Sequence, residues 1–183
     1  MPVSRTLLAL CATAVAASAQ TVTVTTSADV IDINFFTGTM ADLPGPDGKV
    51  SFLEAAIATN NTPGHQTIAF NIPQSEWGLQ FLYPGVAVIM SGPNGFNFTD
   101  SVTIDGTTQT AFTGDTNPNG AEVAIYKSFG SFGSSISGDN SVLTGFHAGE
   151  WGVGGSGSQV FGNTGGVHLN VSGSGHLISG NAA

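Results

Sequence analysis

Cysteine and basic residues are almost absent from this chain of 183 residues. Its one cysteine is Cys11, and Arg5, Lys49 and Lys127 are its three basic residues, against twelve aspartates and glutamates. Nucleic acids and anionic membrane surfaces are bound through clustered lysine and arginine. We therefore expect no nucleic-acid partner and no binding to an anionic membrane.

The N-terminal residues have the three parts of a secretory signal peptide. Arg5 is followed by an apolar run over residues 7–17 and by the small-residue site Ala17-Ser18-Ala19. The run is too short to span a membrane, so we predict a signal peptide over residues 1–19 and a mature chain that starts at Gln20. The mature protein would be secreted or lie at the cell surface. It would contain no cysteine, hence no disulfide, and two lysines against twelve carboxylates would give it a formal charge of −10.

The sequence predicts where one helix starts. In Ser51-Phe52-Leu53-Glu54 the serine can cap the helix that follows, and the glutamate three residues later can bind back to it. This structural cap of Ser51 and Glu54 explains Glu54 better than a catalytic role does. The helix is predicted over about residues 52–59, with Asn60 or Asn61 in the left-handed closing position.

Short apolar segments recur along the second half of the chain. Their first apolar residues are spaced 17 to 21 residues apart: Val102, Val123, Val142, Val160 and Leu177. A strand that recurs at such a period is typical of a solenoid, in which each coil buries its apolar face against the next. Side chains alternate along a strand, so Val102 and Ile104 should point inward.

These patterns predict an all-β fold: a right-handed parallel β-helix (solenoid) with one N-terminal capping α-helix. Residues 20–100 would form the capping region and residues 101–183 the coils. Earlier strands are predicted over residues 21–26, 67–72, 79–82 and 86–90, where apolar and β-branched residues cluster between turn residues.

Several of these segments together resemble the CSLREA-domain proteins, which are bacterial secreted or surface proteins. The resemblance lies in residues 21–32, in Ser51-Phe52-Leu53-Glu54-Ala55-Ala56-Ile57 and in Thr103-Ile104-Asp105-Gly106-Thr107-Thr108-Gln109. It covers about residues 21–181, although the arginine and the cysteine of the family pattern are missing here. The resemblance implies a right-handed parallel β-helix of the pectin-lyase-like kind and a secreted or surface location. It implies no settled activity.

Two constellations are candidate binding sites. Asp115, Asn117 and Asn119 place oxygen ligands at alternate positions before Gly120, as at the start of a calcium loop, so calcium is the one cofactor that the sequence suggests. The twelfth position of such a loop falls on Tyr126 instead of an acid, although Glu122 could substitute, so the pattern fits an ordinary Asn/Pro/Gly loop better. Glu150 and Trp151 could form a platform on which a sugar ring stacks, or the tryptophan could simply cover the fold.

Catalytic residues are harder to find. Polysaccharide lyases and hydrolases need a base or a pair of carboxylates, and Asp105 reads better as a turn residue at a strand end. We therefore expect a structural or adhesive secreted protein without catalysis, with a polysaccharide or cell-surface partner and self-association through the C-terminal coil. The alternative is a polysaccharide-binding or polysaccharide-cleaving protein of the pectate lyase or polygalacturonase kind.

Overall fold

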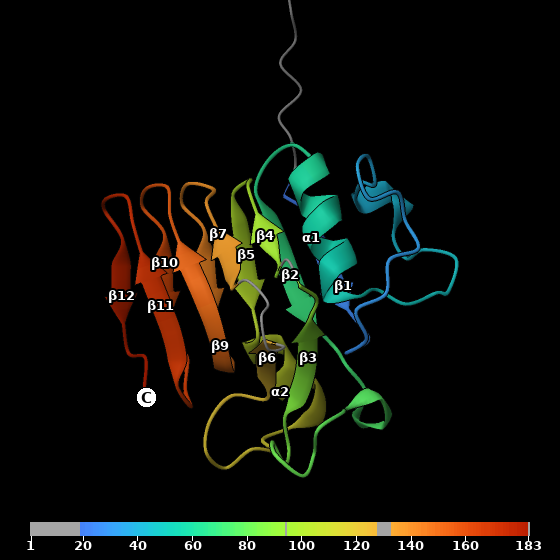
Figure 1. The fold of residues 1–183 in the computed structure, drawn as a ribbon, viewed down its shortest axis with the longest axis vertical. Coiled ribbons are helices and arrows are strands. Elements are labelled where there is room, and N and C mark those ends of the chain that lie inside the picture. The colour runs from blue at the N-terminus through green and yellow to red at the C-terminus, as the bar shows by residue number, and fades with distance from the viewer. Residues whose placement is uncertain (1–18, 94, 128–132, 183) are drawn as a thin grey trace, which may run out of the picture.

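The computed structural model of the protein describes residues 19–93, 95–127 and 133–182. It shows a mixed α/β fold with two parallel β-sheets, one of them curled into a half-barrel, and with helices between strands (Figure 1). The helices are α1 (Phe52–Asn61) and α2 (Thr107–Thr113), with the short 3₁₀ turns η1 (Met40–Asp42) and η2 (Gln74–Glu76).

The first sheet has the strand order β1-β2-β5-β8-β10-β12, with every pair parallel. Its strands are β1 (Thr21–Val24), β2 (Gln66–Phe70), β5 (Val102–Asp105), β8 (Val142–Thr144), β10 (Gln159–Phe161) and β12 (Leu177–Ser179). One row of apolar side chains runs across it in register: Val22, Ile68, Ile104, Leu143, Val160 and Ile178. All of these except Ile178, on the last strand, are buried, so the row forms one wall of the core.

The second sheet has the order β3-β6-β9-β7-β4, and β11 also pairs with β9. Its strands are β3 (Ala87–Ser91), β4 (Asn97–Phe98), β6 (Val123–Lys127), β7 (Ser134–Ile136), β9 (Phe146–Val153) and β11 (Val167–Val171). Strand β9 is long enough to pair with β6 at its start and with β7 and β11 at its end. The register shifts between β6 and β9, and such a bulge bends a strand locally.

The core lies between the two sheets and is rich in aromatic rings. Phe52 on α1 contacts Phe70, Phe96, Phe98 and Trp151, with ring centroids 4.7 to 6.4 Å apart. All five rings are buried. Tilted and edge-to-face pairs of this kind add to the burial of apolar area, so Phe52 fixes α1 against both sheets.

The predicted start of α1 is confirmed. The N–H of Glu54 donates to Ser51 Oγ at 3.1 Å, and the N–H of Ser51 donates to Glu54 Oε2 at 2.9 Å. The helix ends at Asn61, two residues later than predicted. Asn60 and Asn61 both belong to the helix, so the prediction that one of them takes a left-handed closing position is wrong.

The predicted all-β solenoid is wrong, and with it the pectin-lyase-like β-helix that the family resemblance implied. The structure contains a second helix, α2, and its strands form two parallel sheets of a mixed α/β fold. The spacing of the apolar residues in the sequence also does not predict which strands pair or in what register. Val102 and Val123 lie in different sheets, and Val142 is opposite Gln159 instead of Val160.

Helix α2 begins where the sequence suggested only a turn. Asp105 does act as the expected strand-end turn residue, because its Oδ1 accepts hydrogen bonds from the N–H and the hydroxyl of Thr107. The chain then continues as a helix whose Gln109 side chain is fully buried. Gln109 Oε1 accepts the N–H of Ile72 at 2.8 Å, and Gln109 Nε2 donates to the C=O of Ile72 at 3.0 Å. The side chain thus makes the two hydrogen bonds that a neighbouring strand would otherwise make with Ile72.

Most predicted strands are present, with two kinds of error. Val102 and Ile104 point inward, as expected. Residues 79–82 form a turn instead of a strand, and β4, β7, β9 and β11 were not predicted. The predicted signal peptide lies outside the described residues except for Ala19. Among the residues that the structure describes, no helix has the length and apolar character needed to cross a membrane.

Removal of the Ser51 cap should destabilise the protein. We expect Ser51→Ala to lower the free energy of unfolding by about 1 kcal/mol, because Glu54 N–H loses its acceptor. Urea melts of this variant and of a Ser75→Ala control, whose serine is exposed, would measure the difference. An unchanged midpoint for Ser51→Ala would contradict the role of the cap.

Candidate functional site

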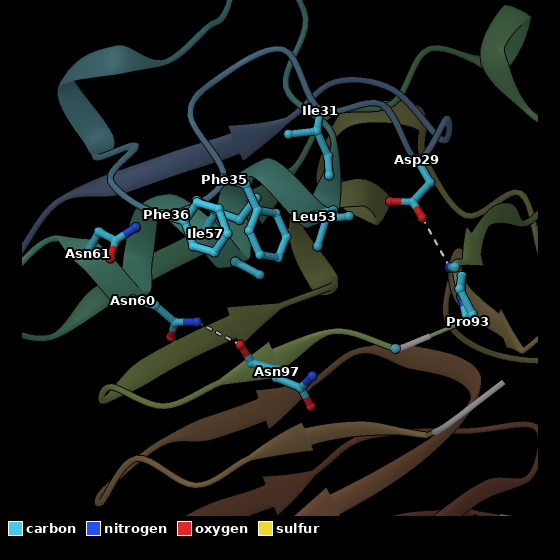
Figure 2. Close-up of a pocket in the computed structure, with 13 residues that line it drawn as sticks. Asp29, Ile31, Phe35, Phe36, Leu53, Ile57, Asn60, Asn61, Pro93 and Asn97 are labelled. Atoms are coloured by element: carbon cyan, nitrogen blue, oxygen red, sulfur yellow. Dashed lines mark hydrogen bonds between the residues drawn. The ribbon is translucent and has the colours of Figure 1, made fainter.

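A pocket of about 530 Å³ opens beside the outer face of α1 (Figure 2). The helix forms its floor, the segment 29–36 forms one wall, and the segment around β4 forms the other. Leu53, Ala56 and Ile57 give the floor an apolar surface. The pocket is therefore a mainly apolar concavity with a few polar groups at its ends.

The side chains of Asn60 and Asn61 connect α1 to both walls of the pocket and do not end the helix. Asn60 Nδ2 donates to the carbonyl of Asn97 at 2.7 Å, and its Oδ1 accepts the N–H of Thr99 at 2.8 Å. Asn61 Nδ2 donates to the carbonyl of Gly38 at 3.0 Å. These bonds hold the two walls at a fixed separation from α1.

The wall over residues 29–36 is anchored by the same residues that cap α1. Ser51 Oγ donates to the carbonyl of Val30 at 2.6 Å, and Glu54 Oε1 accepts the N–H of Asp32 at 2.9 Å. Further along, Asn34 Oδ1 accepts the N–H groups of Phe36 and Thr37, which makes a local turn. Glu54 is nearly fully buried, and this burial raises its pKa above the ordinary value.

Two phenylalanines stand at the rim of the pocket. Phe35 is 53% exposed and Phe36 is 82% exposed, and their rings meet edge to face with centroids 5.2 Å apart. Leu53 and Ile57 of α1 line the same pocket and are drawn next to these rings in Figure 2. Large apolar side chains that gather around a concavity mark binding surfaces more often than scattered ones do.

Asp29 lies at the other end of the pocket from Asn60 and Asn61 (Figure 2). Its Oδ2 accepts the N–H of Gly92 at 3.0 Å. Its Oδ1 is buried and has no hydrogen-bond partner. Burial raises the pKa of Asp29, and the bond from Gly92 opposes this only in part.

The residues predicted to bind calcium lie elsewhere, beside a shallow polar cleft. Asp115 and Asn117 line this cleft together with Glu122, whereas Asn119 is not among its lining residues. Asn117 is buried, its Oδ1 accepts the N–H of Asn119, and its Nδ2 donates to the carbonyl of Ala121. Asn117 therefore has a structural role in the loop, and calcium binding there stays a prediction.

The buried groups next to this cleft are already paired. Thr110 donates its hydroxyl hydrogen to the Glu122 carboxylate, and Asn117 Nδ2 also contacts His147 Nδ1 at 3.1 Å. Burial lowers the pKa of His147, although the nearby Glu122 opposes this. Within the described residues, no group of three or more histidine, cysteine, aspartate or glutamate side chains is placed to hold a metal ion.

Glu150 and Trp151 do not form a platform for a sugar ring. Alternation along β9 turns Trp151 into the core, where its exposed fraction is 0%. Glu150 points outward and pairs with Lys127 Nζ at 2.9 Å, and this hydrogen bond lowers the pKa of Glu150. Because no face of the Trp151 ring is accessible, a sugar cannot stack on it.

The residues that form the pocket were not predicted from the sequence. Asp29, Phe35 and Phe36 lie between the predicted strand at 21–26 and the predicted helix at 52–59. A signal was nevertheless present, because two adjacent phenylalanines in a loop cannot both be buried easily. Leu53, which lines the pocket from α1, is only partly buried.

A scan against protein-family models found no match, and searches of curated proteins and of solved structures found none either. The resemblance to CSLREA-domain proteins therefore rests on the quoted residues alone.

Replacement of Asp29 should change how stability depends on pH. Because the folded-state pKa of Asp29 is raised, the native state binds a proton more tightly than the unfolded state, and stability falls as pH rises from 3.8 through the folded pKa. Asp29→Asn keeps an acceptor for Gly92 and cannot ionise. We expect it to be more stable than the parent protein at pH 7, with a smaller difference at pH 3.5, in thermal melts at both values. A lower stability of Asp29→Asn at pH 7 would contradict this interpretation.

Proposed function

We propose that this protein is a secreted, non-catalytic binding protein that takes up small apolar molecules in the pocket beside α1. The observation that carries the proposal is the apolar concavity between α1 and the segment 29–36, with Phe35 and Phe36 at its rim. Secretion rests on the signal-like residues 1–19. An adhesive role for the protein would use this binding site.

The size and lining of the pocket fit a small ligand. Sites for small molecules usually enclose about 300 to 1,000 Å³ and are lined by apolar and aromatic side chains with a few polar groups. The volume here, about 530 Å³, lies within that range. A molecule that enters would cover the exposed ring of Phe36 and the half-exposed ring of Phe35, so binding would remove apolar surface from water.

The walls are already held in place before a ligand enters. Ser51 and Glu54 fix the start of the loop, Asn60 fixes the wall around β4, and Asn61 fixes Gly38. A pocket that needs little reorganisation loses little conformational entropy when it is filled. This arrangement favours binding of a defined ligand over adaptation to many.

Three carboxylates outside the pocket have partners within the fold, which favours binding over catalysis. Glu76 pairs with Lys49 at 2.7 Å, and Glu150 pairs with Lys127. Asp105 holds the turn before α2. Acid–base work needs groups free to exchange protons with a substrate, and these carboxylates are bound to partners within the fold.

The rim of the pocket gives a direct test of this proposal. Titration with the neutral fluorescent probe N-phenyl-1-naphthylamine should give saturable binding, and Phe36→Ala should weaken it about fivefold or more, because a large apolar contact is lost. Phe81→Ala is the matched control, since Phe81 is 81% exposed and lies outside the pocket. Absence of saturable binding, or equal weakening by both substitutions, would contradict the proposal.

The sheet edges support a second, structural role as a site of self-association. In the described residues β12 pairs only with β10, and Val171, Leu177 and Ile178 on the last two strands are exposed. Residues 151–183 contain no aspartate, glutamate, lysine or arginine. Proteins commonly protect edge strands with charges, so an uncharged apolar edge favours pairing with a second copy.

A lysine placed on this edge should prevent such pairing. We expect the mass of the parent protein in light scattering to rise with concentration, and Ile178→Lys to stay monomeric over the same range. Phe112→Lys adds the same charge at an exposed position on α2 and should behave like the parent protein. A parent protein that is monomeric at every concentration would refute self-association.

A further inference from the structure

The pocket beside α1 has different chemistry at its two ends. At one end the side chains of Asn60 and Asn61 are engaged with backbone groups of the walls. At the other end the carboxyl group of Asp29 accepts a hydrogen bond from Gly92 N–H at Oδ2. An asymmetric pocket of this kind can distinguish the two ends of a ligand.

Asp29 Oδ1 is an acceptor without a donor. Among the side-chain atoms described for the pocket lining, it is the one that is buried and has no hydrogen-bond partner. Figure 2 shows this oxygen directed away from Gly92 and toward the side of Leu53. A buried polar atom without a partner is costly, and a donor brought by a ligand would remove that cost.

The charge around this end favours a cation over an anion. The two lysines of the mature chain are both engaged in ion pairs, Lys49 with Glu76 and Lys127 with Glu150, and neither lines the pocket. The chain without residues 1–19 carries a formal charge of −10. An anionic head group would meet an uncompensated carboxylate, whereas an ammonium group would neutralise it.

We propose that the ligand is an amphiphilic amine, with an ammonium group bound by the Asp29 carboxylate and an apolar body between α1 and Phe35 and Phe36. This inference rests on the proposed function, because it names the chemical class of the ligand for the same pocket. The ammonium group donates to Asp29 Oδ1, and Gly92 continues to hold Oδ2.

A series of three ligands with one apolar body tests the head group. 4-Phenylbutylamine, 4-phenylbutan-1-ol and 4-phenylbutanoate each compete with N-phenyl-1-naphthylamine at pH 7.5. On the parent protein the amine should bind about tenfold more tightly than the alcohol, the usual size of one charge-assisted hydrogen bond, and the carboxylate should bind most weakly. Asp29→Asn should remove the advantage of the amine over the alcohol, because the charged acceptor is gone.

Asp47→Asn is the matched control. It removes the same charge from an exposed residue that does not line the pocket, so it should keep the preference for the amine. An amine that binds no better than the alcohol, or a preference that survives Asp29→Asn, overturns this inference while probe binding still supports the pocket. Loss of probe binding on the parent protein would instead overturn the proposed function itself.

Discussion

The carboxylate of Glu54 connects the start of α1 with the loop that forms one wall of the pocket. One oxygen accepts Ser51 N–H and completes the helix cap, and the other accepts Asp32 N–H. Ser51 adds a third link through its hydroxyl to Val30. Because the Glu54 carboxylate is buried, no water can replace it as the acceptor of these N–H groups, so Glu54 and Ser51 together hold the loop to the helix.

The aromatic core determines where this helix lies. Phe52 follows the cap directly and packs against rings from both sheets, including Phe70 of the first and Trp151 of the second. Once Phe52 is inserted, the side chains of Leu53 and Ile57 lie beside the opening between the two walls. The position of the pocket therefore follows from the packing of the core, and its rim is a local feature of the loop.

The sequence predicts those features that depend on neighbouring residues. The Ser51–Glu54 box, the turn at Asp105 and the inward direction of Val102 and Ile104 all follow from spacings of two or three residues. The fold class could not be predicted in this way, because the pairing of β5 with β8 depends on contacts between distant segments. The burial of Trp151 could not be predicted for the same reason, because the rings of Phe52 and Phe98 that pack against it are far away in sequence.

The tip of the loop that carries Phe35 and Phe36 is stabilised by Asn34, whose side chain and carbonyl bond N–H groups no more than four residues away. Phe35 and Phe36 are both exposed, so the packing of the core does not require phenylalanine at these two positions. Substitutions there would leave the folding of the two sheets unchanged. Related proteins could thus diverge in what they bind while they keep the same scaffold, and selection on ligand choice would act on two positions that stability does not constrain.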